Sequence, residues 1–179
     1  MKHSLLPILL ALFTLMNPSN AEVIEVFEDE DGMHPPKSGA YLWIANPGIL
    51  SKSGKSVIQT NPNPKTMRMQ VSHDIKTGEL EVKGDGQKMT MLPVSKDGSL
   101  PWKGNAKTKA LSATDIALVA GKAKVEELPC WTGKQTTQEG VSVSYSLVQV
   151  MDDLFIGQMT GKRNGLTFHR SFLLKPVSK

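Results

Sequence analysis

Apolar and polar residues alternate most regularly in the C-terminal part of the chain, from Val141 onward. The stretch from Val141 to Leu147 alternates residue by residue, which is the period-2 pattern of a strand with one buried face. Turn signals at Asp152-Asp153 and Asn164-Gly165 then separate two further β-rich runs. The three runs predict an antiparallel meander, and its last strand has an apolar phase made of Leu166, Phe168, Phe172 and Leu174.

Shorter runs of similar character precede this meander. They predict strands at residues 23–27, 40–45, 66–72, 79–82, 87–94 and 122–128. Residues 51–65 are predicted to form a loop around a brief apolar pair, because Ser, Gly and Lys dominate its first part and two Asn-Pro pairs follow.

One segment carries the end signals of a helix. Ser112 is a good N-cap, Asp115 follows at the capping-box spacing, and Gly121 suits the left-handed position after the last turn. These signals predict a short helix over residues 113–120. A single longer helix that reaches Leu128, with Gly121 tolerated inside it, is the alternative.

Eight or nine short strands with one short helix predict a mainly β fold, either a single antiparallel meander barrel or a β-sandwich. A barrel of about eight strands leaves room for packed side chains or for one small ligand. A meander barrel with Trp43 in an early strand and Arg170 in the last strand is similar in architecture to lipocalin-like proteins. Those proteins place glycine two residues before the tryptophan, whereas Gly39 lies four residues before Trp43. The likeness therefore implies an architecture and no functional residues.

The first 21 residues have the pattern of a secretory signal peptide. Lys2 and His3 form a short basic start, residues 5–16 are apolar, and small residues occupy the −3 and −1 positions before a cleavage point after Ala21. The apolar run is shorter than the roughly 20 residues of a transmembrane helix. We expect residues 1–21 to be removed and residues 22–179 to form a single β-rich domain, periplasmic or secreted and without a transmembrane segment.

Charge and cysteine content add little to this picture. Residues 22–31 hold six acids and no Lys or Arg, so the rest of a chain with net charge +4 is markedly basic. A basic body favours anionic partners, but the aromatic residues are too few for a nucleic-acid stacking platform. The only cysteine, Cys130, excludes an intramolecular disulfide and is expected to be a small buried hydrophobe.

No catalytic or cofactor motif is complete. The segment from Gly48 to Ser56 resembles a phosphate-binding loop but has five residues between its glycines instead of four, and the acidic run at 28–32 lacks the ligand positions of an EF-hand. His34, His73 and His169 match no zinc spacing, and there is no GxSxG elbow. We therefore expect neither an enzyme nor a bound cofactor.

The methionines form the most distinctive set of side chains. Met67 and Met69 share one face of a predicted strand, and so do Met89 and Met91 on another. If the two strands lie close together, four thioethers share a surface near His73, and thioethers select Cu(I). The alternative is that these methionines fill an irregular core, which is their commoner use.

The leading functional hypothesis is a non-enzymatic binding module. It would take a small apolar ligand in its interior, or a protein partner on its surface in an inhibitor or immunity-type role. The alternatives are periplasmic Cu(I) handling and an envelope hydrolase with His73 or His169 as base. A buried Arg170 needs a partner or an aromatic ring, for which Trp43 is the expected one. The candidate ligand-binding residues are Arg170, Trp43, Phe168 and Phe172.

We predict that the full-length chain, expressed in a bacterial host, yields an exported protein that begins at Glu22. The intact mass of the exported protein measures the loss of residues 1–21. The variant Ala21→Arg places a long charged side chain at the −1 position and is expected to retain the leader. A wild-type protein that keeps Met1 and stays in the cytoplasm would contradict export.

Overall fold

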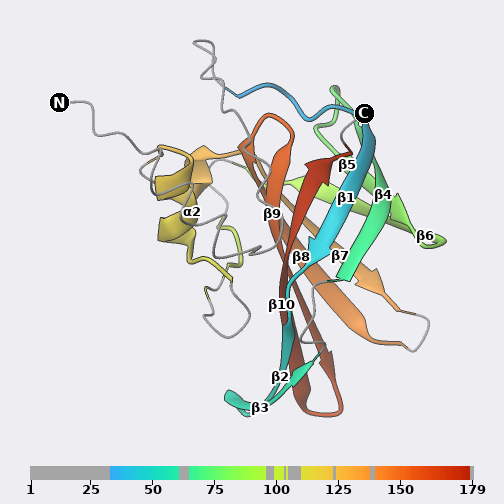
Figure 1. Ribbon diagram of the computed structural model, residues 1–179, viewed down its shortest axis with the longest axis vertical. Coiled ribbons are helices and arrows are strands. Elements are labelled where there is room, and N and C mark those ends of the chain that lie inside the picture. Colours follow the sequence, from blue (N-terminus) through green and yellow to red (C-terminus); the bar gives the residue numbers. More distant parts are fainter. Residues whose placement is uncertain are drawn as a thin grey trace.

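The structure is a computed structural model that describes residues 33–60, 65–95, 99–102, 104, 110–122, 124–137 and 140–177 (Figure 1). Its helical elements are helix α2 (Ala113–Val119) and one turn of 3-10 helix (Val125–Glu127). Its strands are β1 (Gly39–Ala45), β2 (Gly48–Lys52), β3 (Lys55–Thr60), β4 (Lys65–His73), β5 (Leu80–Gly84), β6 (Gln87–Pro93), β7 (Cys130–Thr136), β8 (Ser142–Met151), β9 (Leu154–Arg163) and β10 (Leu166–Pro176).

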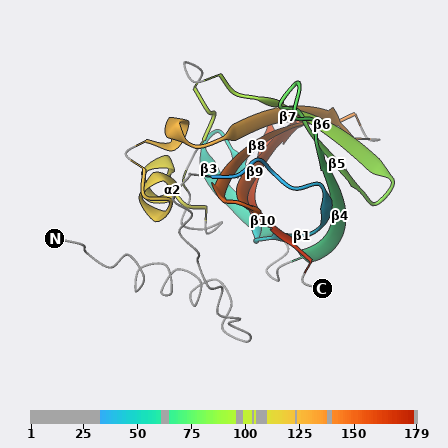
Figure 2. The same ribbon diagram turned by 90° about the horizontal axis from the view of Figure 1, so that it is seen from above.

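Eight of these strands close into an antiparallel barrel (Figure 2). The hydrogen-bonded order is β1-β4-β5-β6-β7-β8-β9-β10, and β1 pairs with β10 to complete the ring. Strands β8, β9 and β10 form the predicted meander. Its second turn has positive φ angles at both Asn164 (49°) and Gly165 (75°), as a type I′ hairpin turn requires. The structure confirms the barrel form of the predicted fold.

The remaining hairpin, β2–β3, extends the sheet below the ring in Figure 1. Strand β10 pairs with β1 over residues 172–176 and with β2 over residues 166–169, so its partner changes at Arg170-Ser171. At the change, Asn46 donates from its backbone N to Ser171 O (3.0 Å) and from Nδ2 to Ser171 Oγ (2.9 Å). On its other side β1 pairs with β4, whereas β2 pairs with β3. The sheet beside β10 therefore divides at this point into the barrel wall and the β2–β3 hairpin.

The inner core fills the upper part of the barrel. Tyr41, Leu147 and Phe155 belong to it and are at most 2% exposed. The Tyr41 hydroxyl lies within hydrogen-bond distance of Lys37 O (2.9 Å) and Asp153 Oδ1 (3.2 Å). Burial, with the nearby Asp153 charge, raises the pKa of Tyr41 well above its usual value. The phenol is therefore a neutral donor that ties the core to the segment before β1.

That segment, residues 33–38, closes the upper end of the barrel (Figure 1). Gln149 is fully buried, and its Nε2 donates to His34 O (2.8 Å) and Asp152 O (2.6 Å). His34 also donates from its backbone N to Asp152 Oδ1 (2.8 Å), which is the main reason why the pKa of Asp152 is lowered. The closed end is thus held by hydrogen bonds among Gln149, His34 and Asp152, while Gln149 Oε1 has no partner among the described residues.

A second core lies outside the barrel, under helix α2. Ile116 and Ala117 of the helix belong to one cluster with Val148 of β8 and Ile156 of β9. Cys130 is buried in the same cluster as expected, and its thiol donates to Leu128 O (3.2 Å). None of the described helices is long and apolar enough to cross a membrane.

Helix α2 begins and ends as its sequence predicts. The Ser112 hydroxyl accepts a hydrogen bond from Asp115 N (3.1 Å), and Asp115 Oδ2 accepts one from Ser112 N (3.0 Å), which completes a capping box. Gly121 follows the last turn with φ at +67°. The expected short helix is confirmed, and the longer alternative to Leu128 is wrong.

Several predicted elements are corrected by the structure. Residues 51–60 of the predicted loop at 51–65 instead belong to the β2–β3 hairpin, whose turn has positive φ at Ser53 and Gly54, and residues 61–64 lie outside the described residues. Strand β2 ends in the exposed Lys52, so its sequence lacks the alternation that marks a strand with one buried face. The predicted strand at 122–128 is wrong, because the chain forms one 3-10 turn at Val125–Glu127. This turn brings Val125 and Leu128 into the core. Strand β7 was not expected, and the described chain has ten strands instead of eight or nine. The predicted strand at 23–27 lies outside the described residues.

We predict that Gln149→Leu destabilises the closed end of the barrel. The substitution keeps an apolar side chain of similar size but leaves two carbonyl oxygens without their donor, which costs about 1–3 kcal/mol. Urea denaturation measures the change, with the exposed Gln70→Leu in β4 as the matched control. Equal stability of the two variants would show that the Gln149 hydrogen bonds do not hold this end together.

Candidate functional site

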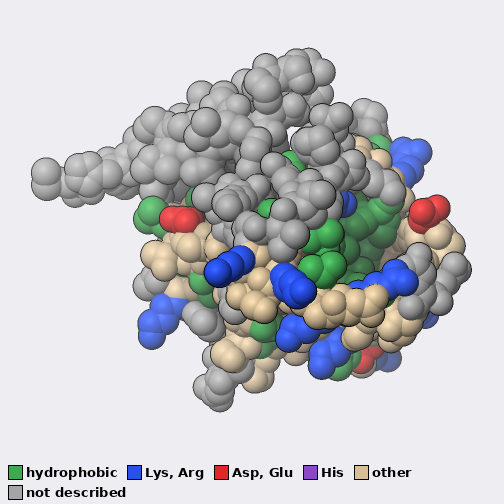
Figure 3. Space-filling model, turned by 90° about the horizontal axis from the view of Figure 1, so that it is seen from below, with side chains coloured by type: hydrophobic (Ala, Val, Ile, Leu, Met, Phe, Trp, Pro, Cys, Tyr) green, Lys and Arg blue, Asp and Glu red, His purple; other side chains and the backbone are tan. Residues whose placement is uncertain are grey.

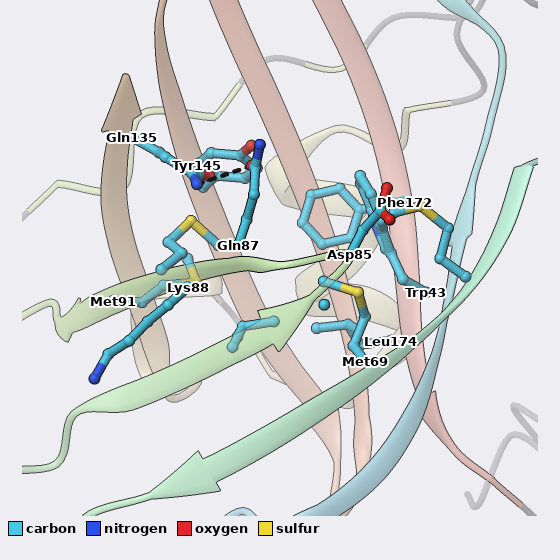
Figure 4. A pocket seen from close by; sticks show the side chains of 14 residues that line it. Trp43, Met69, Asp85, Gln87, Lys88, Met91, Gln135, Tyr145, Phe172 and Leu174 are labelled. Atoms are coloured by element: carbon cyan, nitrogen blue, oxygen red, sulfur yellow. Dashed lines mark hydrogen bonds between the residues drawn. The ribbon is translucent and has the colours of Figure 1, made fainter. Parts of the chain in front are cut away.

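The candidate site is a cavity inside the barrel, below the inner core, with a volume of about 190 Å³. Its wall is mainly apolar and is drawn from seven strands, β1, β4, β5, β6, β7, β8 and β10, because inward positions alternate along a strand. Figure 4 shows the labelled side chains around the hollow from several sides. The apolar lining includes Trp43, Met69, Val82, Met91, Phe172 and Leu174.

Two glycines make room for large side chains in this wall. A Cβ on Gly157 would overlap the Phe172 ring, so the ring lies directly over the β9 backbone. The Trp43 indole meets Phe172 edge-on, with 5.3 Å between the ring centroids. In the same way, a Cβ on Gly84 would overlap the Met69 thioether. The shape of the cavity therefore depends on glycines in β9 and β5 as much as on its apolar side chains.

A few polar groups also face the cavity. Gln135 Nε2 donates to Gln87 Oε1 (2.9 Å), and the pair is drawn with a dashed line in Figure 4. Asp85 and Lys88 also contribute to the lining, and Lys88 Nζ forms an ion pair with Glu81. Tyr145 is partly buried, and its burial raises the pKa of its phenol. An apolar hollow with few polar groups is the usual form of a small-molecule site.

A second, wider hollow of about 760 Å³ lies along the extension of the sheet below the ring. It is lined by residues of β2, β8, β9 and β10, among them Leu50, Met159 and Phe168. Gln87 lines both hollows, so they meet at the amide pair. Figure 3 looks into the molecule from this side and shows apolar side chains in the hollow with Lys and Arg around it. The cavity therefore opens at the lower end, opposite the closed one.

Arg170 lies between the two hollows along β10. It is paired with Met159 in the neighbouring strand, which places both side chains on the inner face. Its guanidinium Cζ is 5.5 Å from the centroid of the Phe168 ring. Its Nε is buried and has no hydrogen-bond partner among the described residues. Burial lowers the pKa of Arg170, yet a guanidinium remains charged.

The structure places three of the four predicted ligand-binding residues in the lining of the two hollows. Trp43 and Phe172 line the cavity and Phe168 lines the wider hollow, whereas Arg170 lies between Phe168 and Phe172 along β10 and is in neither lining. One expectation is corrected, because the ring under Arg170 is Phe168 and not Trp43, which contacts Phe172 instead. The reason is local: Phe168 and Arg170 are two residues apart on one face of the same strand.

The four predicted methionines also come together. Met67 and Met69 of β4 and Met89 and Met91 of β6 all line the cavity, on either side of β5. His73 is not part of this lining and lies at the far end of β4, beside Ser38. Within the described ranges, no three His, Cys, Asp or Glu side chains are close enough to hold a metal ion.

The two histidines considered as catalytic bases are separated. His73 is in β4 and His169 in β10, and β1 runs between these strands. His73 shares the inward phase of Val71, whereas His169 has the opposite phase from Phe168 and Arg170. The structure does not form one site from them.

Several lining residues were not identified from the sequence. Gln87 and Gln135 look like exposed polar strand residues, and only the β6–β7 pairing reveals that they face each other. Tyr145 belongs to a clear alternating run, but alternation alone does not say which phase is inside. No family model matches this chain, and neither the curated proteins nor the solved structures gave a match in the comparisons.

Proposed function

We propose that this protein is an exported, non-enzymatic carrier or sensor that binds one small apolar molecule inside its barrel. The observation that supports this function is the cavity of about 190 Å³, closed above by the inner core and open below. The leader-like pattern of residues 1–21 supports export. The cavity favours the small-ligand form of the hypothesis over a partner that binds only to the outer surface.

The size of the cavity limits the ligand. An apolar cavity of about 150 Å³ in a protein core accepts benzene, so this one has room for a ring or a branched alkyl segment. Burial of that segment contributes about 25 cal/mol per Å² of apolar surface removed from water. Longer molecules would continue into the wider hollow, which meets the cavity at Gln87.

We predict that the neutral fluorophore 1-aminoanthracene binds in the cavity with increased emission. The variant Val82→Phe adds a ring at a buried lining position and is expected to weaken binding at least tenfold. Fluorescence titration measures the dissociation constant.

The matched control is Leu92→Phe, which adds a ring on the outer face of β6, where Leu92 is 54% exposed. A second blocking variant, Met89→Trp, covers the case in which Val82→Phe does not fold. If both blocking variants fold and bind the dye as Leu92→Phe does, the cavity is not the binding site.

A second candidate function is the binding of a soft metal ion in the same cavity. The observation that favours it is the presence of Met67, Met69, Met89 and Met91 in one lining. Thioethers are ligands for Cu(I) and Ag(I), and their strands are held in fixed register by β5. His73 is not part of this proposal, since it lies outside the lining.

We predict for this second function that Ag(I) shifts the methyl NMR signals of the four lining methionines. The titration is done in the Cys130→Ala background, because a thiolate would compete for the metal. Met151, in the outer core, is the internal control and is expected not to shift. Unchanged methyl signals at micromolar Ag(I) would exclude a metal site and leave the methionines as apolar lining.

A further inference from the structure

Two hydrogen-bond donors on the inner face of the barrel have no partner. Trp43 Nε1 and Arg170 Nε are both buried, and neither forms a hydrogen bond with any described residue. Buried polar groups are nearly always satisfied, and leaving one unpaired costs about 1–3 kcal/mol. Because both groups donate, what this region lacks is an acceptor.

The position of Arg170 in the sheet explains why it lacks a hydrogen-bond acceptor. Arg170 lies where β10 changes its partner from β1 to β2, so the barrel wall divides beside it. No described Asp or Glu forms an ion pair with it, and burial is the cause of its lowered pKa. The Arg170 side chain therefore lies on the inner face between Phe172, which lines the cavity, and Phe168, which lines the wider hollow, and its buried Nε has no partner among the described residues.

Basic side chains also occur in both linings. Arg163 lines the wider hollow, and Lys88 lines the cavity together with the acid Asp85, although Lys88 Nζ is paired with Glu81. Several Lys and Arg side chains lie along the lower side of the apolar hollow in Figure 3. An apolar interior with a basic mouth complements a molecule that has an apolar body and one negative group.

We infer that the ligand is a single-chain amphiphile with an anionic head, such as a fatty acid, whose tail occupies the cavity and whose head binds Arg170. This inference rests on the proposed function and adds the class of ligand and its orientation. The carboxylate supplies the acceptor that the guanidinium lacks, in a region where burial strengthens a charge-assisted hydrogen bond. The Phe168 ring below the guanidinium holds it toward the junction.

The test compares dodecanoate with 1-dodecanol, which has a tail of the same length and no charge. Each displaces 1-aminoanthracene from the wild-type protein and from Arg170→Met, which keeps an unbranched apolar side chain. Loss of a charge-assisted hydrogen bond is expected to weaken dodecanoate binding about tenfold to a hundredfold. Binding of 1-dodecanol and of the dye is expected to stay within about threefold of the wild type.

The matched control is Arg68→Met, which removes an exposed arginine from the outer face of β4 and is expected to change neither affinity. If Arg170→Met and Arg68→Met bind dodecanoate equally well, or if wild-type protein prefers dodecanol, the head does not bind Arg170. Those results overturn this inference while leaving the cavity as an apolar site. Failure of the dye to bind wild-type protein would instead overturn the proposed function itself. Dodecyl phosphate, tested in parallel, shows whether the anionic head is restricted to a carboxylate.

Discussion

Strand β10 is shared between two partners, and this division determines both the closure of the barrel and the position of its mouth. Over residues 172–176 it pairs with β1 and completes the ring, and over residues 166–169 it pairs with β2. The Asn46–Ser171 hydrogen bonds lie at the change and satisfy polar groups of a backbone that has just left one ladder for another. Closure above this point removes the sheet edges, and division below it exposes the inner face.

The two ends of the barrel differ in how their buried polar groups are paired. At the closed end, Gln149 Nε2, His34 and Asp152 form hydrogen bonds with one another and the Tyr41 phenol bonds Lys37 O, although Gln149 Oε1 has no partner among the described residues. Toward the open end, the buried donors of Trp43 and Arg170 have no acceptor among the described residues.

Glycines set the shape of the space between these ends. Gly157 lets the Phe172 ring rest on β9, and Gly84 does the same for the Met69 thioether on β5. Side chains at either position would push their neighbours into the cavity, so the hollow exists because two inward positions lack a Cβ. Methionine suits such a wall, since its unbranched thioether adapts to an irregular ligand surface. The same sulfurs would also suit a soft metal ion, which is why one lining supports two candidate functions.

The sequence by itself determined the meander, helix α2 and its cap, the burial of Cys130 and the mainly β class, because these follow from local alternation and turn chemistry. It also placed Met67 with Met69, and Met89 with Met91, on one face of a strand each, since the period of a strand is two residues. It did not identify β7 or the β2–β3 hairpin, whose sequences show no regular alternation of apolar and polar residues. Only the tertiary structure decided that Gln87 meets Gln135 and that the methionine pairs share one cavity. Those relations depend on which strands become neighbours when the sheet closes, and a periodic pattern along one strand contains no information about its partners.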